Sequence, residues 1–129
     1  MAYPAFATKA NRTHNVETVR DSFKFAVGAA GAVGTLSQAS GGFVTSVTRA
    51  GAGDYTVQLA KPYPASIVRC DVSTGVVAAN SATHRAAYKA GSYSAAAGTF
   101  TIYNSDAAPA AADPVNGSEI MVDLVFLEV

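Results

Sequence analysis

The sequence has one cysteine, no tryptophan and no long apolar run, and each of these shortages excludes a class of protein. The single thiol, Cys70, excludes a framework of internal disulfides and fits folding in a reducing compartment. No segment approaches the roughly 20 apolar residues of a membrane-spanning helix, and the first residues lack the basic and apolar regions of a signal peptide. We therefore expect synthesis in the cytoplasm and no membrane partner.

Charge is also scarce and balanced. Lys and Arg together number nine, as do Asp and Glu, so the formal net charge is zero, which argues against a general nucleic-acid-binding surface. From Asn104 onward there are five acidic and no basic residues, whereas the preceding part has nine basic and four acidic residues, a net charge of +5. We interpret this asymmetry either as pairing within the chain or as complementary patches that meet between neighbouring subunits.

No pattern in the sequence predicts catalysis, a cofactor or a metal centre. His14 and His84 are 70 residues apart, and no Cys or His lies at metal-ligand spacing from either. No serine stands in a nucleophile-elbow pattern. The glycines of Gly28–Gly34 are spaced as in a dinucleotide-binding loop, but Gly41-Gly42 would break the following helix and no βαβ series follows. The sequence therefore predicts a protein that is not an enzyme.

From Phe23 onward, short segments of alternating or β-branched residues are separated by Gly and Pro turns, a pattern typical of sandwiches and barrels. No segment shows a long, capped helical period. We predict an all-β domain over residues 23–129, an antiparallel β-sandwich with the eight strands of a jelly roll. The predicted strands are Phe23–Val27, Gly34–Gln38, Phe43–Arg49, Asp54–Ala60, Ser66–Val72, Arg85–Ala90, Gly98–Tyr103 and Glu119–Leu127.

Two strands folded back on a glycine turn, Val47–Leu59, organise this prediction. The second half of the segment alternates apolar and polar residues, as in a half-buried strand. Gly51–Gly53 supplies the positive φ angles that a tight reversal needs. The last strand, Ile120–Leu127, is apolar at nearly every position, so we expect it to be central in a sheet or pressed against another subunit.

Residues 1–22 differ from the rest because a few apolar side chains are scattered among polar and basic ones without strict alternation. The segment is too short to stand alone as a helix. We predict an extended N-terminal arm that docks on a neighbouring molecule, where its apolar groups are buried and its basic groups meet an acidic surface. The candidate partner-binding residues are Tyr3, Phe6, Lys9, Arg12, His14 and Arg20.

The hairpin Val47-Thr-Arg-x-Gly-x-Gly-x-Tyr-Thr-Val-x-Leu59 resembles a segment of structural proteins of tailed bacteriophages, in which a Pro-containing loop follows, here Lys61-Pro-Tyr-Pro64. The strand Gly98–Tyr103, the Asp- and Ala-rich loop Asn104–Ser118 and the closing apolar strand are similar too. The resemblance covers roughly residues 43–129. It implies a virion component, either a small β-sandwich that decorates or cements a capsid or a domain of a tail fibre.

Two features favour capsid decoration over a tail fibre: the chain is one small domain without a repetitive shaft, and its N-terminal arm suits a protein that grips a lattice. We therefore expect a structural protein on the capsid surface that binds the major capsid protein. A tail-fibre or tail-spike domain and a host-surface carbohydrate-binding module are the alternatives. The apolar last strand predicts a homo-oligomer, and the resemblance implies a trimer, because decoration proteins often occupy threefold positions.

Overall fold

The computed structural model describes residues 18–38, 42–75, 77, 84–106 and 110–127. Each of the eight predicted segments overlaps a strand, and β8 has the predicted bounds. A single 3₁₀ turn, η1 (Ala29–Gly31), joins the first two strands. The strands are β1 (Thr18–Val27), β2 (Val33–Gln38), β3 (Val44–Gly51), β4 (Asp54–Leu59), β5 (Ser66–Gly75), β6 (Arg85–Tyr88), β7 (Thr99–Ser105) and β8 (Glu119–Leu127).

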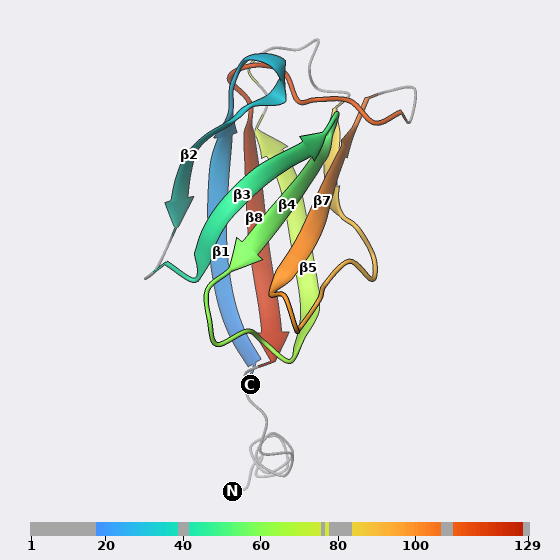
Figure 1. Cartoon of the computed structure of the whole chain (residues 1–129). Helices are drawn as coiled ribbons and strands as arrows, with labels where there is room; N and C mark the ends of the chain where they lie inside the picture. Colours follow the sequence, from blue (N-terminus) through green and yellow to red (C-terminus); the bar gives the residue numbers. More distant parts are fainter. Residues whose placement is uncertain (1–17, 39–41, 76, 78–83, 107–109, 128–129) are drawn as a thin grey trace, which may run out of the picture.

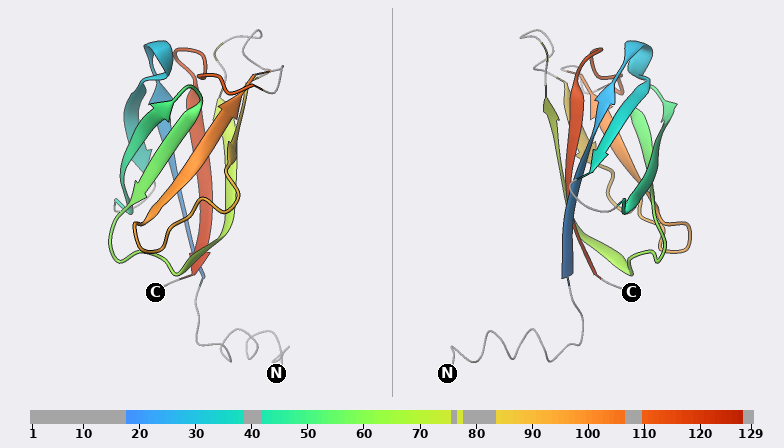
Figure 2. Two further views of the ribbon diagram at one scale, coloured as in Figure 1. Left: turned by 45° about the vertical axis from the view of Figure 1, so that its right-hand side comes forward. Right: turned by 90° about the vertical axis from the view of Figure 1, so that its left-hand side faces the viewer.

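The strands form two four-stranded antiparallel sheets that pack face to face (Figures 1 and 2). Sheet I has the order β2-β1-β8-β5, and sheet II has the order β3-β4-β7-β6. The predicted eight-stranded antiparallel sandwich is confirmed. β1–β2, β3–β4 and β6–β7 are hairpins within one sheet, and the other four connections cross from one sheet to the other.

Alternation along the strands places the apolar side chains between the sheets. In β4 the odd-numbered residues Tyr55, Val57 and Leu59 are buried, and in β8 the even-numbered residues from Ile120 to Phe126 are buried. Phe25 from sheet I packs against Tyr55 from sheet II with ring centroids 5.4 Å apart. These side chains belong to one continuous core, so the residues that point away from it form the two outer faces of the sandwich.

The predicted boundary between arm and domain at residue 22 falls inside β1. That strand begins at Thr18, which pairs with Leu127 of β8, and Val19 packs against the core. Residues 18–22 therefore belong to the sandwich, because the ladder with β8 continues to its end. Both described ends of the chain lie side by side at one end of the molecule (Figure 1).

The glycine-rich segment Gly28–Gly34 forms the turn of the β1–β2 hairpin, and it is followed by a strand and not by a helix.

The Gln38 side chain joins the two sheets at their edge. Its Nε2 donates to the Val44 carbonyl at 2.9 Å, and its Oε1 accepts from the Val44 amide at 3.0 Å. One amide side chain thus bridges β2 of sheet I to β3 of sheet II.

The end of the sandwich opposite the chain termini is held by a polar cluster that we call the rim, comprising Gly31, Arg49, Gly53, Tyr55 and Asp113. Asp113 accepts hydrogen bonds from Arg49 Nε at 2.9 Å, from Arg49 Nη2 at 2.8 Å and from the Gly53 amide at 2.9 Å. The Arg49 hydrogen bond, helped by the Gly53 amide, holds the pKa of Asp113 below its usual range against the opposing effect of burial.

Tyr55 and two glycines complete the rim. The Tyr55 hydroxyl is buried and donates to the Gly31 carbonyl at 2.7 Å. Burial, with a smaller contribution from the Asp113 charge, raises the pKa of Tyr55 to about 12. Gly53 has φ +65°, and a Cβ there would overlap the backbone of Asn104 and Ala112, so the β3–β4 turn can approach the next loop only as glycine.

Candidate interaction face

β8 lies between β1 and β5 in sheet I, which confirms the prediction that it is central. Because successive side chains of a strand point to opposite sides, half of β8 faces away from the core. We call the outward-pointing side chains of β1, β8 and β5 the sheet I face. β8 contributes Glu119, Met121, Asp123, Val125 and Leu127 to it.

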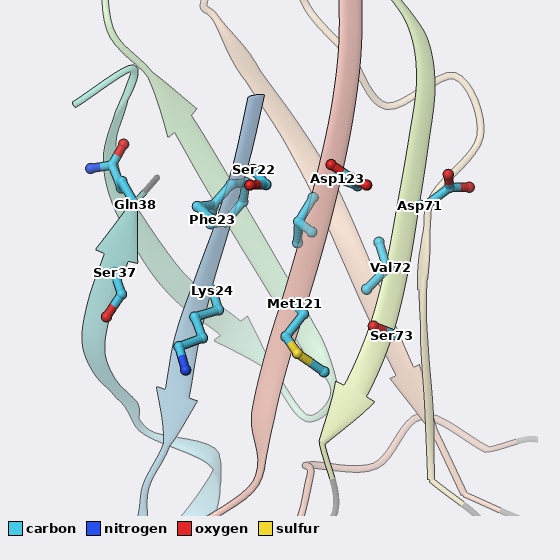
Figure 3. A pocket seen from close by; sticks show the side chains of 11 residues that line it. Ser22, Phe23, Lys24, Ser37, Gln38, Asp71, Val72, Ser73, Met121 and Asp123 are labelled. Carbon is cyan, nitrogen blue, oxygen red and sulfur yellow. The ribbon is translucent and has the colours of Figure 1, made fainter. Parts of the chain in front are cut away.

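The antiparallel register arranges the sheet I face in rows that run across the strands, two of which are visible in Figure 3. An arginine row, an aspartate row, a lysine row and a glutamate row follow one another, so the sign of the charge alternates from row to row. From the chain termini toward the rim, the rows are Thr18–Leu127–Ser66, Arg20–Val125–Arg69, Ser22–Asp123–Asp71, Lys24–Met121–Ser73 and Ala26–Glu119–Gly75.

A groove of about 560 Å³ crosses the face between the aspartate row and the lysine row, from β2 to β5 (Figure 3). Three of its seven polar lining residues are serines, Ser22, Ser37 and Ser73, which leave room between longer neighbours. Met121 borders the groove with 37% of its surface exposed. The complete lining is Ser22, Phe23, Lys24, Ser37, Gln38, Asp71, Val72, Ser73, Met121, Val122 and Asp123.

Two ion pairs lie within the sheet I face. Lys24 Nζ is 3.1 Å from Glu119 Oε2, and Arg69 Nε is 2.7 Å from Asp71 Oδ2. All four side chains are between 43% and 62% exposed, and exposed pairs of this kind add little to the free energy of unfolding. These pairs hold charges in place on the surface more than they stabilise the fold.

Arg20 and Asp123 are the two charged residues of this face that form no ion pair within the described part of the chain. Both are exposed. Asp123 also lies directly opposite Asp71 in the β5–β8 ladder, and like charges in that position destabilise a sheet. The face therefore presents charge that has no ion-pair partner among the described residues of the chain.

Of the six residues that the sequence suggested as partner-binding, Arg20 lies on this face, in the arginine row of β1. Tyr3, Phe6, Lys9, Arg12 and His14 lie outside the described residues. Sequence reasoning missed the aspartate row, although the acidic Asp123 within an apolar strand was a signal for an outward position.

Pairing within the chain accounts for part of the charge asymmetry of the sequence. Arg49–Asp113 and Lys24–Glu119 each join a basic residue of the first part to an acidic residue of the last part.

Cys70 faces the core from β5. Burial raises the pKa of its thiol to about 12, with a smaller contribution from Asp71. His84 Nδ1 lies 3.2 Å from the side-chain nitrogen of the buried Asn104.

Neither of two other kinds of site occurs among the residues that the structure describes. They include no group of three or more His, Cys, Asp or Glu residues placed to hold a metal ion, and no helix of theirs has the length and apolar character needed to cross a membrane. Comparison of the chain with protein-family models gives no match, and neither do comparisons with curated proteins and with solved structures.

Proposed function

We propose that this chain is a structural virion protein that decorates or cements a bacteriophage capsid by binding the lattice of the major capsid protein. It is made in the host cytoplasm and has its place on the capsid surface. It acts by contact rather than by catalysis, and neither nucleic acid nor membrane is among its partners.

The observation that carries this proposal is the β3–β4 hairpin. The residues that bear the resemblance to phage structural proteins form two paired strands around the positive-φ Gly53, and β4 lies in the interior of sheet II. The closing strand β8, which shares in that resemblance, occupies the corresponding interior place in sheet I. The similar sequence segments are thus the central framework of a small sandwich, which is the kind of domain that the resemblance implies.

Mass spectrometry of purified virions tests the proposal. We expect the chain at a fixed, high copy number relative to the major capsid protein, and in the capsid fraction after tails are removed. Its presence in the tail fraction alone would support the tail-fibre or tail-spike alternative. Its absence from the particle, together with glycan binding in an array, would support a host-surface carbohydrate-binding module.

The N-terminal segment has its own test within this proposal. A chain that begins at Thr18 retains β1 as the structure defines it, so we expect the truncated protein to fold and to bind capsids more weakly than the full chain. Unchanged capsid binding by the truncated protein would contradict a docking role for Tyr3, Phe6, Lys9, Arg12 and His14. Circular dichroism of both proteins controls for folding.

Self-association is the second part of the proposal. The resemblance implies three copies. The apolar character of β8 requires only that another molecule cover the outer side of this strand.

A further inference from the structure

The sheet I face is self-complementary. Its six charged side chains are three basic and three acidic, so the face is neutral as a whole although neighbouring rows carry opposite signs. A uniformly acidic or basic partner would meet repulsion at every second row. A second copy of the same face, turned so that its arginine row lies over the aspartate row of the first, would meet attraction at both of these rows. The six residues are Arg20, Lys24, Arg69, Asp71, Glu119 and Asp123.

We propose that a second copy of this chain docks on the sheet I face through a two-fold axis. The axis runs across the strands, parallel to the rows, and lies between the arginine row and the aspartate row. In such an isologous contact, residue i meets residue j and residue j meets residue i. Each arginine row then lies over the aspartate row of the other copy.

This placement compensates the charges that the isolated subunit leaves open. Asp123 comes to lie over Val125 of the second copy, between the arginines of the same row, Arg20 and Arg69. Arg20 in turn reaches the aspartate row of the second copy. The repulsion between Asp71 and Asp123, which face each other across β5 and β8, is relieved by two guanidinium groups.

The same axis brings apolar side chains together. The lysine row of one copy lies over the terminal row of the other, so Met121 meets Leu127 of the second copy. Met121 is exposed, and Val125 and Leu127 are partly exposed. Asp123 lies between Met121 and Val125 on the outer side of β8, so the two contacts between Met121 and Leu127 flank the charged centre of the interface.

The overlapping area is that of a weak pair. Three strands spaced about 4.8 Å apart, overlapping over about eight residues at about 3.4 Å per residue, give roughly 400 Å² in each copy. Both copies together then bury about 800 Å², which is the size of a weak and transient contact. We therefore expect a dimer of low affinity that weakens further as salt is added.

Sedimentation velocity of the full chain from 1 to about 100 μM tests this inference. We expect a dimer of twice the 13.1 kDa chain mass. Arg20→Asp and Asp123→Arg, each alone, should raise the dimer dissociation constant at least tenfold, and the two together should restore it toward the wild-type value. Arg85→Asp, which makes the same change in charge at an exposed position of β6 in sheet II, should leave it unchanged.

Disulfide cross-linking tests the axis independently of affinity. A chain with Met121→Cys and Leu127→Cys should form a covalent dimer under mild oxidation, whereas Met121→Cys alone should not, because the two copies of residue 121 lie three rows apart. A wild-type monomer at 100 μM, a trimer, or a dimer indifferent to both charge reversals would overturn the inference. Capsid binding is measured separately, so these outcomes bear on self-association and leave the proposed role in the virion intact.

Discussion

Arginine and aspartate occur both at the rim and on the sheet I face, but they have different roles in the two places. At the rim, Arg49 and Asp113 form a two-pronged ion pair, and the carboxylate also accepts the Gly53 amide. On the sheet I face, Arg20 and Asp123 have no such partners within the described residues. The arginine and aspartate of the rim join a loop to a hairpin, whereas Arg20 and Asp123 are exposed on an open face.

The difference lies in what surrounds the charges. Backbone approaches backbone closely at the rim because two glycines lack side chains there, and a carboxylate inside such a turn satisfies an amide that water reaches poorly. The sheet I face is open, so its charges are hydrated and contribute little to folding. We therefore expect rim substitutions to change the stability of the subunit and face substitutions to change its association.

The largest loss of stability is expected from Gly53→Ala. The new Cβ would meet the backbone of Asn104 and Ala112 at a positive φ, and strain and overlap together cost about 2–5 kcal/mol. Gly51→Ala is the matched control, since a Cβ at Gly51 has nothing within 4 Å. Urea unfolding of both variants measures the difference, and equal stability of the two would contradict the rim as described.

Asp113→Ala should have the next largest effect. It leaves the amide of the buried Gly53 without its acceptor, which costs about 1–3 kcal/mol. Asp71→Ala removes the same side chain from an exposed pair and should change the unfolding free energy much less.

Acid should reduce the advantage of the wild type over Asp113→Asn. Because the folded-state pKa of Asp113 is lowered from its ordinary value of 3.8, its contribution to stability is present above that pH and is lost as the pH falls through the folded-state pKa. Thermal unfolding of both proteins between pH 7 and pH 2 measures this. A gap in Tm that stays constant down to pH 2 would show that the carboxylate charge does not stabilise the rim.

Tyr55→Phe should cost about 1 kcal/mol, because the Gly31 carbonyl loses a buried donor while the ring still fills its place in the core. Tyr88→Phe is the control, since the ring of Tyr88 also packs against the core. We expect the control to unfold within about 0.5 kcal/mol of the wild type. Chemical denaturation at neutral pH distinguishes the two.

The smallest effect on subunit stability is expected on the sheet I face. Arg20→Asp should unfold within about 0.5 kcal/mol of the wild type when both are diluted to monomers. Its effect should appear only as the protein concentration rises, because association stabilises the folded state by mass action. A destabilisation that is independent of concentration would place Arg20 in the fold rather than in a contact.

Local patterns predicted the strands well, because alternation and glycine turns are properties of neighbouring residues. Every predicted segment is a strand, and the alternation of Tyr55, Val57 and Leu59 marks the buried side of β4 correctly. The start of β1 was placed too late, since Val19 is held by a ladder with β8, about 100 residues away in sequence. Such pairing has no local signal.

The sheet I face could not be predicted from the sequence, because it depends on which strands pair and in which register. Rows of charge arise only when β1 and β5 flank β8 in a particular register, and a shift of one residue would exchange inner and outer side chains. The Arg49–Asp113 pair likewise joins residues 64 positions apart. The charge asymmetry of the chain hinted at such pairs without identifying the partners.

The pairing of Thr18 with Leu127 has a mechanical consequence. Both described ends leave the sandwich at the same end and on adjacent strands, and the hydrogen bonds between antiparallel strands run perpendicular to them. A force applied between these two ends would therefore separate β1 from β8 by breaking their hydrogen bonds one after another. A pull between Thr18 and the rim would instead load many bonds of that ladder at once, so the resistance of the subunit to force depends on where the force is applied.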